Sequence, residues 1–278
     1  MKILILGAGG MLGHDLVNAF IDENIFVADM PEWDITKFED LRSKIINCRP
    51  DVIINSAAYT DVEGAEDNQD WTFKVNAEGV KNLSIIANEF NIPLVQISTE
   101  YVFDGKRQSG YDENSPTSSI NAYGRSKEQG EKYLLETCKK YYLIRTSWLF
   151  GKAPQTGKPR GKNFIDKIID LGLSQNEVKV VNDQFGHPTF TKDLSKAVKN
   201  IIDQKLAYGI YHVINEATAS WYDLAKEAFT LKGIKTPLIP VVSTEFPSRV
   251  MRPKYSILNN NKLPKLRPWQ EAVKEYLA

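Results

Sequence analysis

Cysteine and histidine are scarce in this chain, which has two cysteines and three histidines among its 278 residues. Cys48 and Cys138 are too few to form the disulfide framework of a small secreted protein. The cysteines and histidines also lack the close spacing of zinc ligands. We therefore predict no metal site, and we expect a reduced, cytoplasmic environment.

The chain also lacks net charge and long apolar runs. Its 35 lysines and arginines balance 35 aspartates and glutamates, so no excess of positive charge points to nucleic acid or an anionic membrane. The apolar residues 3–6 are followed directly by glycines, so this stretch is too short for a signal peptide or a membrane span. We predict no nucleic-acid partner, no membrane association, and either one large domain or two unequal lobes.

A strand, a glycine-rich turn and a helix are predicted at the start of the chain. Residues 2–6 are typical of a strand buried on both faces of a parallel sheet. Gly7, Gly10 and Gly13 would allow a tight turn, a close approach to a pyrophosphate and close packing of helix on strand. The helix N-terminus would offer free N–H groups to the phosphates. This arrangement predicts a dinucleotide site; the alternative is a glycine-rich turn without a ligand.

The next predicted strand, residues 25–28, ends at Asp29. A carboxylate about 20 residues after the glycines can accept hydrogen bonds from the adenosine ribose, and it would repel a 2′-phosphate. No arginine adjoins Asp29, so NADH is the simplest expectation, although Lys37 or Arg42 could still favour NADPH.

The segment after Asp29 is predicted to lie beside the adenine ring and then to start a helix. Asp34 and Ile35 are the residues expected near the ring. Thr36 and Glu39 have the spacing of a capping box, so we predict that they begin the following helix.

Small and polar side chains follow two further predicted strands. Residues 56–60 come after the strand at 51–55, and Thr99 and Glu100 come just after the strand at 92–97. Ligands of open α/β sheets bind in the crevice at the carboxyl ends of the strands. Thr99 and Glu100 are therefore predicted to face the reacting group, although ordinary turn chemistry would also explain them.

Tyr123 and Lys127 lie four residues apart in a run of good helix formers, residues 123–139. Residues four apart share one face of a helix, so the phenol and the ammonium would point into the same space. A nearby cation lowers the pKa of a phenol, which would make Tyr123 a usable general acid. An ordinary amphipathic pair is the alternative for such a match in isolation.

Strands and helices continue to alternate along the rest of the chain. This alternation predicts an α/β fold, a Rossmann-type doubly wound parallel sheet with a smaller C-terminal substrate lobe. A basic segment, residues 249–256, includes Arg252 and could hold a substrate pyrophosphate, or it could be a solvated loop. We predict a dinucleotide-binding domain of residues 1–147 and 176–216, and a substrate-binding lobe of residues 148–175 and 217–278.

Together these segments resemble the extended short-chain dehydrogenases/reductases and, more narrowly, the dTDP-4-dehydrorhamnose reductase family. The resemblance spans nearly the whole chain, and finding its segments in this order is more specific than a glycine motif alone. The segments that carry it are Ala57-Ala58-Tyr59-Thr60, Ser98-Thr99-Glu100-Tyr101-Val102-Phe103, Tyr123-Gly124-Arg125-Ser126-Lys127, Arg145-Thr146-Ser147-Trp148, Asn182-Asp183-Gln184-Phe185-Gly186 and Arg252-Pro253-Lys254-Tyr255-Ser256.

The resemblance implies an enzyme that uses NADPH or NADH to reduce the C4 ketone of a nucleotide sugar, dTDP-4-dehydro-L-rhamnose. Thr99, Tyr123 and Lys127 would be its catalytic residues. Besides Gly7, Gly13 and the catalytic Tyr123 and Lys127, the cofactor would contact Gly10, Met11, Leu12, Asp29, Asp34, Ile35, Ala58, Tyr59, Thr60 and Ile97. The expected substrate-binding residues are Thr99, Glu100, Tyr101, Trp148 and Arg252, with Trp148 covering the apolar face of the sugar.

Two positions depart from the family pattern. Glu100 stands where the family usually has Asp, and its extra methylene could alter proton delivery or sugar preference. Some members hold magnesium with glutamates at a dimer interface, but Lys192 falls where one such acid would be. We therefore expect neither that metal site nor that dimer, and a monomer and another homodimer both remain open.

Two other functions remain as alternatives. Related nucleotide-sugar dehydratases carry an Asp-Glu pair after the Thr, whereas here Glu100 is followed by Tyr101, which disfavours elimination of water. Epimerases belong to the same superfamily. The regulatory subunit of methionine adenosyltransferase also resembles this family. A non-catalytic dinucleotide-binding subunit is therefore the third hypothesis, and the presence of Thr99, Tyr123 and Lys127 argues against it.

Overall fold

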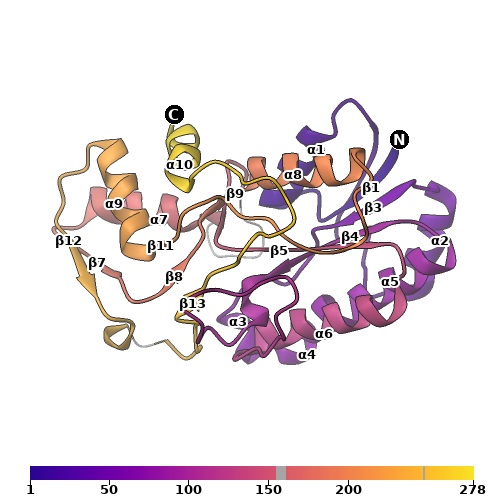
Figure 1. Ribbon diagram of the computed structural model, residues 1–278, viewed down its shortest axis with the longest axis horizontal. Helices are drawn as coiled ribbons and strands as arrows, with labels where there is room; N and C mark the ends of the chain where they lie inside the picture. The colour runs from indigo at the N-terminus through magenta and orange to yellow at the C-terminus, as the bar shows by residue number, and fades with distance from the viewer. Residues whose placement is uncertain (155–160, 247) are drawn as a thin grey trace.

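The computed structural model describes residues 1–154, 161–246 and 248–278, and its main feature is a six-stranded parallel sheet (Figure 1). The strand order is β10-β5-β4-β3-β1-β2. The central strands are apolar and buried on both faces, as predicted for a parallel sheet. The strands are β1 (Lys2–Leu6), β2 (Asn24–Ala28), β3 (Val52–Asn55), β4 (Leu94–Thr99), β5 (Tyr141–Thr146) and β10 (Gly209–His212).

Helices cover both faces of this sheet (Figure 1). On one face Ile3 and Ile5 of β1 pack in a core with Leu16 of α1 and Val198 of α8, and on the other face Leu4 of β1 packs in a second core with residues of the remaining helices. The predicted doubly wound Rossmann-type sheet is therefore confirmed. The covering helices are α1 (Met11–Ala19) and α8 (Thr191–Asp203) on one side, and α2 (Phe38–Cys48), α5 (Gly79–Glu89) and α6 (Ala122–Thr137) on the other.

A smaller lobe lies beside the carboxyl ends of the sheet strands, and it has its own core. Phe229, Trp269 and Ile165 are buried together there. Its helices are α7 (Phe164–Ser174), α9 (Trp221–Lys232) and α10 (Trp269–Leu277). Its short strands pair as β7 (Val178–Val181) with β12 (Leu238–Val241), as β6 (Leu149–Phe150) with β9 (Thr189–Phe190), and as a sheet of β11 (Ala219–Ser220), β8 (Phe185–Gly186) and β13 (Tyr255–Ser256).

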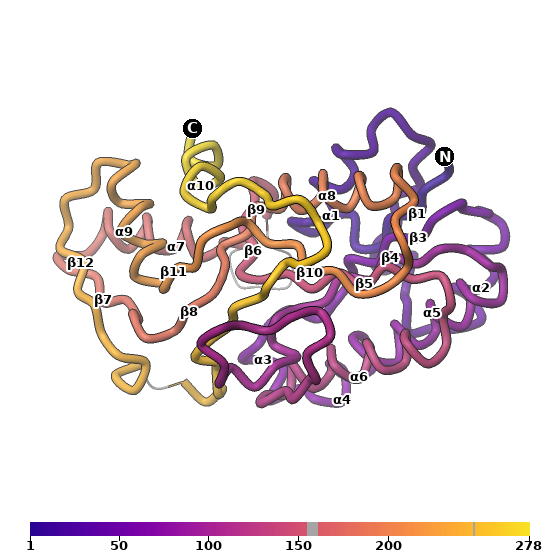
Figure 2. Tube along the Cα trace, viewed as in Figure 1, coloured from indigo at the N-terminus to yellow at the C-terminus, as the bar shows by residue number. Residues whose placement is uncertain are grey.

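The C-terminal part of the chain returns to the segment that follows β4 (Figure 2). The N–H of Tyr111 donates to the carbonyl of Ile257 at 3.0 Å, and the N–H of Tyr255 donates to the carbonyl of Gly105 at 3.0 Å. Residues far apart in sequence therefore form one wall of the molecule here. Short helices complete the fold: α3 (Gly64–Asp67), α4 (Gln69–Phe73), the π-helix η1 (Lys74–Glu78), and the 3₁₀-helices η2 (Glu100–Val102) and η4 (Ser243–Glu245).

The predicted capping box at the start of α2 is wrong. Thr36 donates both its N–H, at 2.9 Å, and its hydroxyl, at 2.7 Å, to the carboxylate of Asp34. Lys37 is the residue that precedes the helix, and it makes no side-chain cap. Thr36 is therefore bonded to Asp34 and does not cap α2. Asp side chains often accept the backbone N–H two residues later in the chain, as Asp34 does here. Among the described residues, no helix is long and apolar enough to cross a membrane.

A buried ion pair ties α6 to β5. The Arg145 guanidinium donates to both carboxylate oxygens of Glu131, at 2.7 to 3.2 Å, and both side chains are 3% exposed. Ser98 of β4 also donates to this carboxylate, at 2.5 Å. Removing one partner of such a pair leaves an uncompensated charge in the core.

We expect Glu131→Gln to lower the free energy of unfolding by about 3–5 kcal/mol, because Arg145 would remain buried without its counter-ion. Urea denaturation followed by circular dichroism measures this change. Lys265→Gln is the control, since it removes an exposed partner of Glu216 and should change stability by no more than about 0.5 kcal/mol. Equal midpoints for Glu131→Gln and the unmodified protein would contradict the expectation.

Candidate active site

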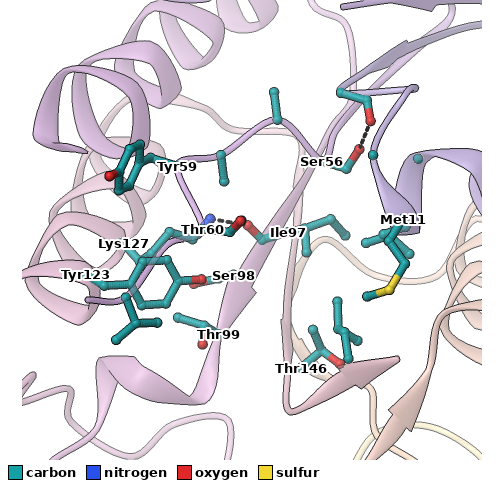
Figure 3. A pocket seen from close by; sticks show the side chains of 18 of the residues that line it. Met11, Ser56, Tyr59, Thr60, Ile97, Ser98, Thr99, Tyr123, Lys127 and Thr146 are labelled. Atoms are coloured by element: carbon teal, nitrogen blue, oxygen red, sulfur yellow. Dashed lines mark hydrogen bonds between the residues drawn. The ribbon is translucent and has the colours of Figure 1, made fainter. Parts of the chain in front are cut away.

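One cavity of about 520 Å³ lies at the carboxyl ends of the sheet strands, where the sheet meets the smaller lobe (Figure 3). Each residue that the sequence nominated for the cofactor, the substrate or catalysis lines this cavity. They are Gly7, Gly10, Met11, Leu12, Gly13, Asp29, Asp34, Ile35, Ala58, Tyr59, Thr60, Ile97, Thr99, Glu100, Tyr101, Tyr123, Lys127, Trp148 and Arg252.

The glycine turn between β1 and α1 packs too closely against neighbouring backbone for side chains at two of its glycines. Gly7 has φ +75°, and a Cβ there would lie 2.6 Å from the backbone nitrogen of Ala57. A Cβ on Gly13 would lie 2.0 Å from the carbonyl oxygen of Gly7, so this glycine allows α1 to pack directly on the turn. Gly10 precedes α1 without a side-chain cap, which leaves the first N–H groups of the helix facing the cavity. Such groups suit a pyrophosphate.

Asp29 follows β2 and is hydrogen-bonded to the glycine turn. Its carboxylate accepts the N–H of Gly9 at 2.8 Å and its own neighbour Met30 at 2.8 Å, so both oxygens are already oriented by the backbone. The two cations that could favour NADPH are paired with other carboxylates. Lys37 lies 3.8 Å from Asp34, and Arg42 pairs with a glutamate on α5. The end of the cavity beside Asp29 is therefore acidic.

Asn76 fixes the loop that follows β3. Its side-chain carbonyl accepts the N–H of Tyr59 at 2.9 Å, and its amide group donates to the Tyr59 carbonyl at 3.0 Å and to the Ser126 hydroxyl at 3.0 Å. Asn76 is 1% exposed and lies in the π-helix η1. A π-turn is a frequent feature of functional sites. Here Asn76 links the loop after β3 to α6, the helix that carries Tyr123.

Thr99 and Glu100 form a hydrogen-bonded pair at the end of β4. The Thr99 hydroxyl donates to the Glu100 carboxylate at 2.7 Å and accepts the N–H of Tyr101 at 3.2 Å. Glu100 is buried, and burial raises its pKa to about 7, although hydrogen bonds from Thr99 and Ser147 oppose this shift. This carboxyl group therefore changes its charge near neutral pH.

Tyr123 and Lys127 lie on the same side of the cavity as Thr99, opposite Met11 (Figure 3). We predicted that Lys127 lowers the pKa of Tyr123, and this direction is wrong. Burial raises the pKa of the phenol, and the charge of Glu100 raises it further. The ammonium of Lys127 donates instead to the carbonyl of Ile97 at 2.8 Å, and burial lowers its pKa to about 8.

An aromatic wall forms the side of the cavity nearest the smaller lobe. The Trp148 ring stacks on Trp221 with centroids 3.6 Å apart and planes 8° apart, and Phe164 packs against Trp221 at 4.7 Å. Trp148 has φ +46°, an uncommon conformation for a non-glycine residue. A Cβ on Gly186 would lie 2.6 Å from the Trp148 ring, so this glycine makes room for the indole.

Arg252 lines the cavity and is bonded to side chains of the segments that follow β3 and β4. Its guanidinium donates to the Tyr101 hydroxyl at 3.2 Å and to the Glu63 carboxylate at 2.8 Å. The Tyr101 ring in turn meets Tyr123 edge to face at 5.7 Å. The basic segment is therefore not a freely solvated loop at this position, because Tyr101 and Glu63 hold the Arg252 side chain beside the cavity.

The described residues contain no group of histidine, cysteine, aspartate and glutamate side chains that could hold a metal ion. Lys192, which the sequence placed at a family metal position, lies 2.6 Å from Glu275, and Arg267 lies 2.6 Å from the same carboxylate. These two cations lower the pKa of Glu275 to about 2. The carboxylate is thus neutralised by side chains of its own chain.

Several cavity residues were not singled out from the sequence. Their apolar or small side chains carry no chemical signal, and tertiary contacts alone bring them to the site. These cavity residues are Met30, Trp33, Val62, Trp71, Val75, Phe164, Ile165, Trp221 and Leu224. Asn76 does not line the cavity but holds the adjoining loop, and a lone asparagine inside a helical stretch could have been questioned.

Comparison with known proteins assigns the family. The RmlD substrate binding domain family matches residues 1–278. The chain is 35% identical to a dTDP-4-dehydrorhamnose reductase of Aggregatibacter actinomycetemcomitans, over 100% of this chain and 98% of that one. It is 35% identical to a dTDP-4-keto-6-deoxy-D-glucose reductase of Streptomyces niveus, over 97% of this chain and 90% of that one.

A solved structure agrees with this assignment. The dTDP-4-dehydrorhamnose reductase of Bacillus anthracis, in complex with NADP, superposes with a TM-score of 0.93 at 36% identity, over 99% of this chain and 98% of that one. Sequence and structure match along the whole length, including the strand ends that form the cavity. The chain therefore belongs to the RmlD substrate binding domain family and is an NAD(P)-dependent nucleotide-sugar reductase of that family.

Proposed function

We propose that this protein reduces the C4 ketone of dTDP-4-dehydro-L-rhamnose to give dTDP-L-rhamnose. The observation that carries this proposal is the meeting of Thr99, Tyr123 and Lys127 in the cavity that also contains the glycine turn. A hydroxyl, a phenol and an ammonium beside a dinucleotide site suit hydride transfer to a ketone. The names of several relatives support this choice of sugar.

Each catalytic residue has a separate role in the proposed reaction. A bound reduced nicotinamide supplies the hydride. Tyr123 donates its phenolic proton to the alkoxide that develops at C4, and Thr99 holds the keto oxygen by a hydrogen bond. Lys127, which is fixed by the Ile97 carbonyl, holds the nicotinamide ribose and places a positive charge near the phenol.

The raised pKa of Tyr123 fits a proton donor. A phenol that stays neutral at physiological pH is ready to donate, and the alkoxide formed by ketone reduction is a stronger base than a phenolate. The role of Lys127 in this proposal is to stabilise the phenolate after the proton has left. Lys127 is protonated only below its pKa of about 8, so turnover should decline as the pH rises through that value.

The substrate is proposed to lie between the two lobes. Trp148 would cover the apolar face of the sugar, and Glu100 and Tyr101 would border it. Arg252 carries the positive charge that a diphosphate needs, and a guanidinium can bind phosphoryl oxygens through two N–H groups. Its anchoring by Tyr101 supports this placement.

We propose that each lobe binds one of the two ligands. Residues 1–147 and 176–216 would bind the dinucleotide, and residues 148–175 and 217–278 would bind the nucleotide sugar, with residues 155–160 and 247 outside the described part of the chain. The position of β10 in the six-stranded sheet supports the second segment of the dinucleotide-binding domain, whereas β7 pairs with β12 of the smaller lobe.

NADH is the proposed cofactor, and NADPH is the alternative. The Asp29 carboxylate would accept hydrogen bonds from the ribose hydroxyls and would repel a 2′-phosphate. Lys37 and Arg42 are paired with carboxylates, which weakens the case for a phosphate site. The Bacillus anthracis relative was solved with NADP, and this observation favours the alternative.

A second candidate substrate follows from one relative. The Streptomyces niveus protein is named a dTDP-4-keto-6-deoxy-D-glucose reductase, so the sugar could differ at C3 and C5 while the same ketone is reduced. Oxidation of NADH or NADPH with each of the two keto sugars, followed by analysis of the products, separates these candidates. Absence of oxidation with both sugars would contradict the proposed reaction and favour a non-catalytic dinucleotide-binding subunit.

We expect Tyr123→Phe to lower kcat by about 100- to 10,000-fold, because the proton donor is lost while the ring remains. Binding of NADH, measured by fluorescence, should change little, since the phenol is not needed to hold the pyrophosphate. Turnover equal to that of the unmodified enzyme would reject Tyr123 as the proton donor.

We expect Asp29→Asn to reduce the preference for NADH over NADPH by about tenfold or more, equivalent to about 1.4 kcal/mol, because a negative charge next to the 2′-phosphate is removed. The ratio of kcat/KM values for the two cofactors measures this change. Asp40→Asn makes the same charge change at an exposed site, where Asp40 pairs with Lys44, and should leave the ratio unaltered. A preference for NADPH in the unmodified enzyme would contradict the proposal.

A further inference from the structure

The hydroxyl of Thr99 has one proton, and in this structure that proton is directed away from the place proposed for the substrate. A hydroxyl donates one hydrogen bond and accepts two. Thr99 donates to the Glu100 carboxylate at 2.7 Å and accepts from the N–H of Tyr101 at 3.2 Å. Only a lone pair is then left to face a keto oxygen, which is itself an acceptor. In this state Thr99 could not hold the keto oxygen.

We propose that Glu100 must carry a proton for Thr99 to act, so that Glu100 is a positioning residue that switches Thr99 from acceptor to donor. The protonated carboxyl donates to the Thr99 hydroxyl, which then accepts from Glu100 and from the Tyr101 N–H. Both acceptor positions of the hydroxyl are filled, and its single proton is free for the keto oxygen. No proton leaves Glu100 in this step, because the proton added to the alkoxide still comes from Tyr123.

The surroundings of Glu100 favour the protonated form. Glu100 is 4% exposed, and among the described residues no cation contributes to the shift of its pKa. Its pKa is raised to about 7 by burial, and the hydrogen bonds from Thr99 and Ser147 only partly offset this. An unpaired buried carboxyl group takes up a proton more readily than an exposed one.

The titratable groups that face Glu100 come from three segments. Tyr101 adjoins it on η2, and Tyr123 faces it from α6, where its pKa responds to the charge of Glu100. Arg252 of the C-terminal segment is bonded to the Tyr101 hydroxyl, and Lys127 is bonded to the Ile97 carbonyl. Both cations therefore have other partners. The Thr99 hydroxyl meets two titratable side chains, the carboxyl group of Glu100 and the phenol of Tyr123, whose pKa is raised by burial against the weaker, lowering effect of its hydrogen bond with Thr99.

This inference rests on the proposed function, because it assumes that Thr99 meets a keto oxygen. A carboxylate that binds the sugar works best when it is ionised, whereas a carboxyl that orients Thr99 works only when it is protonated. The two roles therefore predict opposite dependences on pH.

The test compares pH profiles of kcat for the unmodified enzyme, Glu100→Gln and Glu100→Ala. In the unmodified enzyme, kcat should fall about tenfold per pH unit above about pH 7, as Glu100 loses its proton. The Gln side chain can present an N–H to Thr99 at every pH, so the decline should move to about pH 8, where Lys127 titrates. Glu100→Ala removes the acceptor that draws the Thr99 proton away, so kcat of this variant should also show no decline near pH 7.

Glu113→Gln is the matched control. Glu113 is another buried carboxyl, 3% exposed, which accepts hydrogen bonds from Asn261 outside the cavity. This variant should keep the decline near pH 7. A decline that remains near pH 7 in Glu100→Gln, or a rise in KM with the pH profile unchanged, would overturn the switch and leave Glu100 as a sugar-binding carboxylate.

A second measurement does not require turnover. Infrared difference spectra between the unmodified enzyme and Glu100→Gln should show the carbonyl band of a protonated carboxyl that disappears as the pH rises through about 7. A carboxyl already ionised at pH about 6 would reject the inference even if the enzyme is active. If the proposed function is wrong, the enzyme reduces neither keto sugar, but the infrared band of Glu100 still changes with pH. This result differs from the one that rejects the inference.

Discussion

The parallel arrangement of the central sheet is the constraint on which the site depends. In a parallel sheet all carboxyl ends lie at the same edge, so the segments that follow β1, β3, β4 and β5 are brought to one place. Each of these segments contributes side chains to the same cavity. The backbone N–H groups at the start of α1 and the side chains after β4 therefore face one another across a short distance, although many residues separate them in sequence.

The polar groups of the cavity are held by partners from the fold itself. Asn76 fixes the loop after β3, the Ile97 carbonyl fixes Lys127, and Tyr101 holds Arg252 beside the cavity. Buried polar groups that have partners keep a defined orientation, whereas a free side chain would have to be ordered when the ligand binds. The pair of Thr99 and Glu100 differs from these contacts, because we propose that the direction of its hydrogen bond depends on whether Glu100 carries a proton.

Much of the fold and of the site was predictable because local pattern and chemistry agree. Strands buried on both faces are continuous apolar runs, as at β1, and the glycine turn has a spacing imposed by backbone geometry. Predictions that involve the environment of a side chain were less successful. The expected fall in the pKa of Tyr123 was wrong, because burial and Glu100 outweigh the nearby ammonium. The capping role of Thr36 was wrong because Asp34 binds its hydroxyl.

The amino-acid sequence alone determined the class of fold, the position of the glycine turn and the candidate residues that line the cavity, because periodicity, glycine spacing and side-chain type are local properties. The tertiary structure decided how those side chains meet their neighbours. The stacking of Trp148 on Trp221, the anchoring of Arg252 and the burial of Glu100 each join segments that are distant in the chain. Protonation states and side-chain orientations follow from burial and partner geometry, which exist only once the chain has folded.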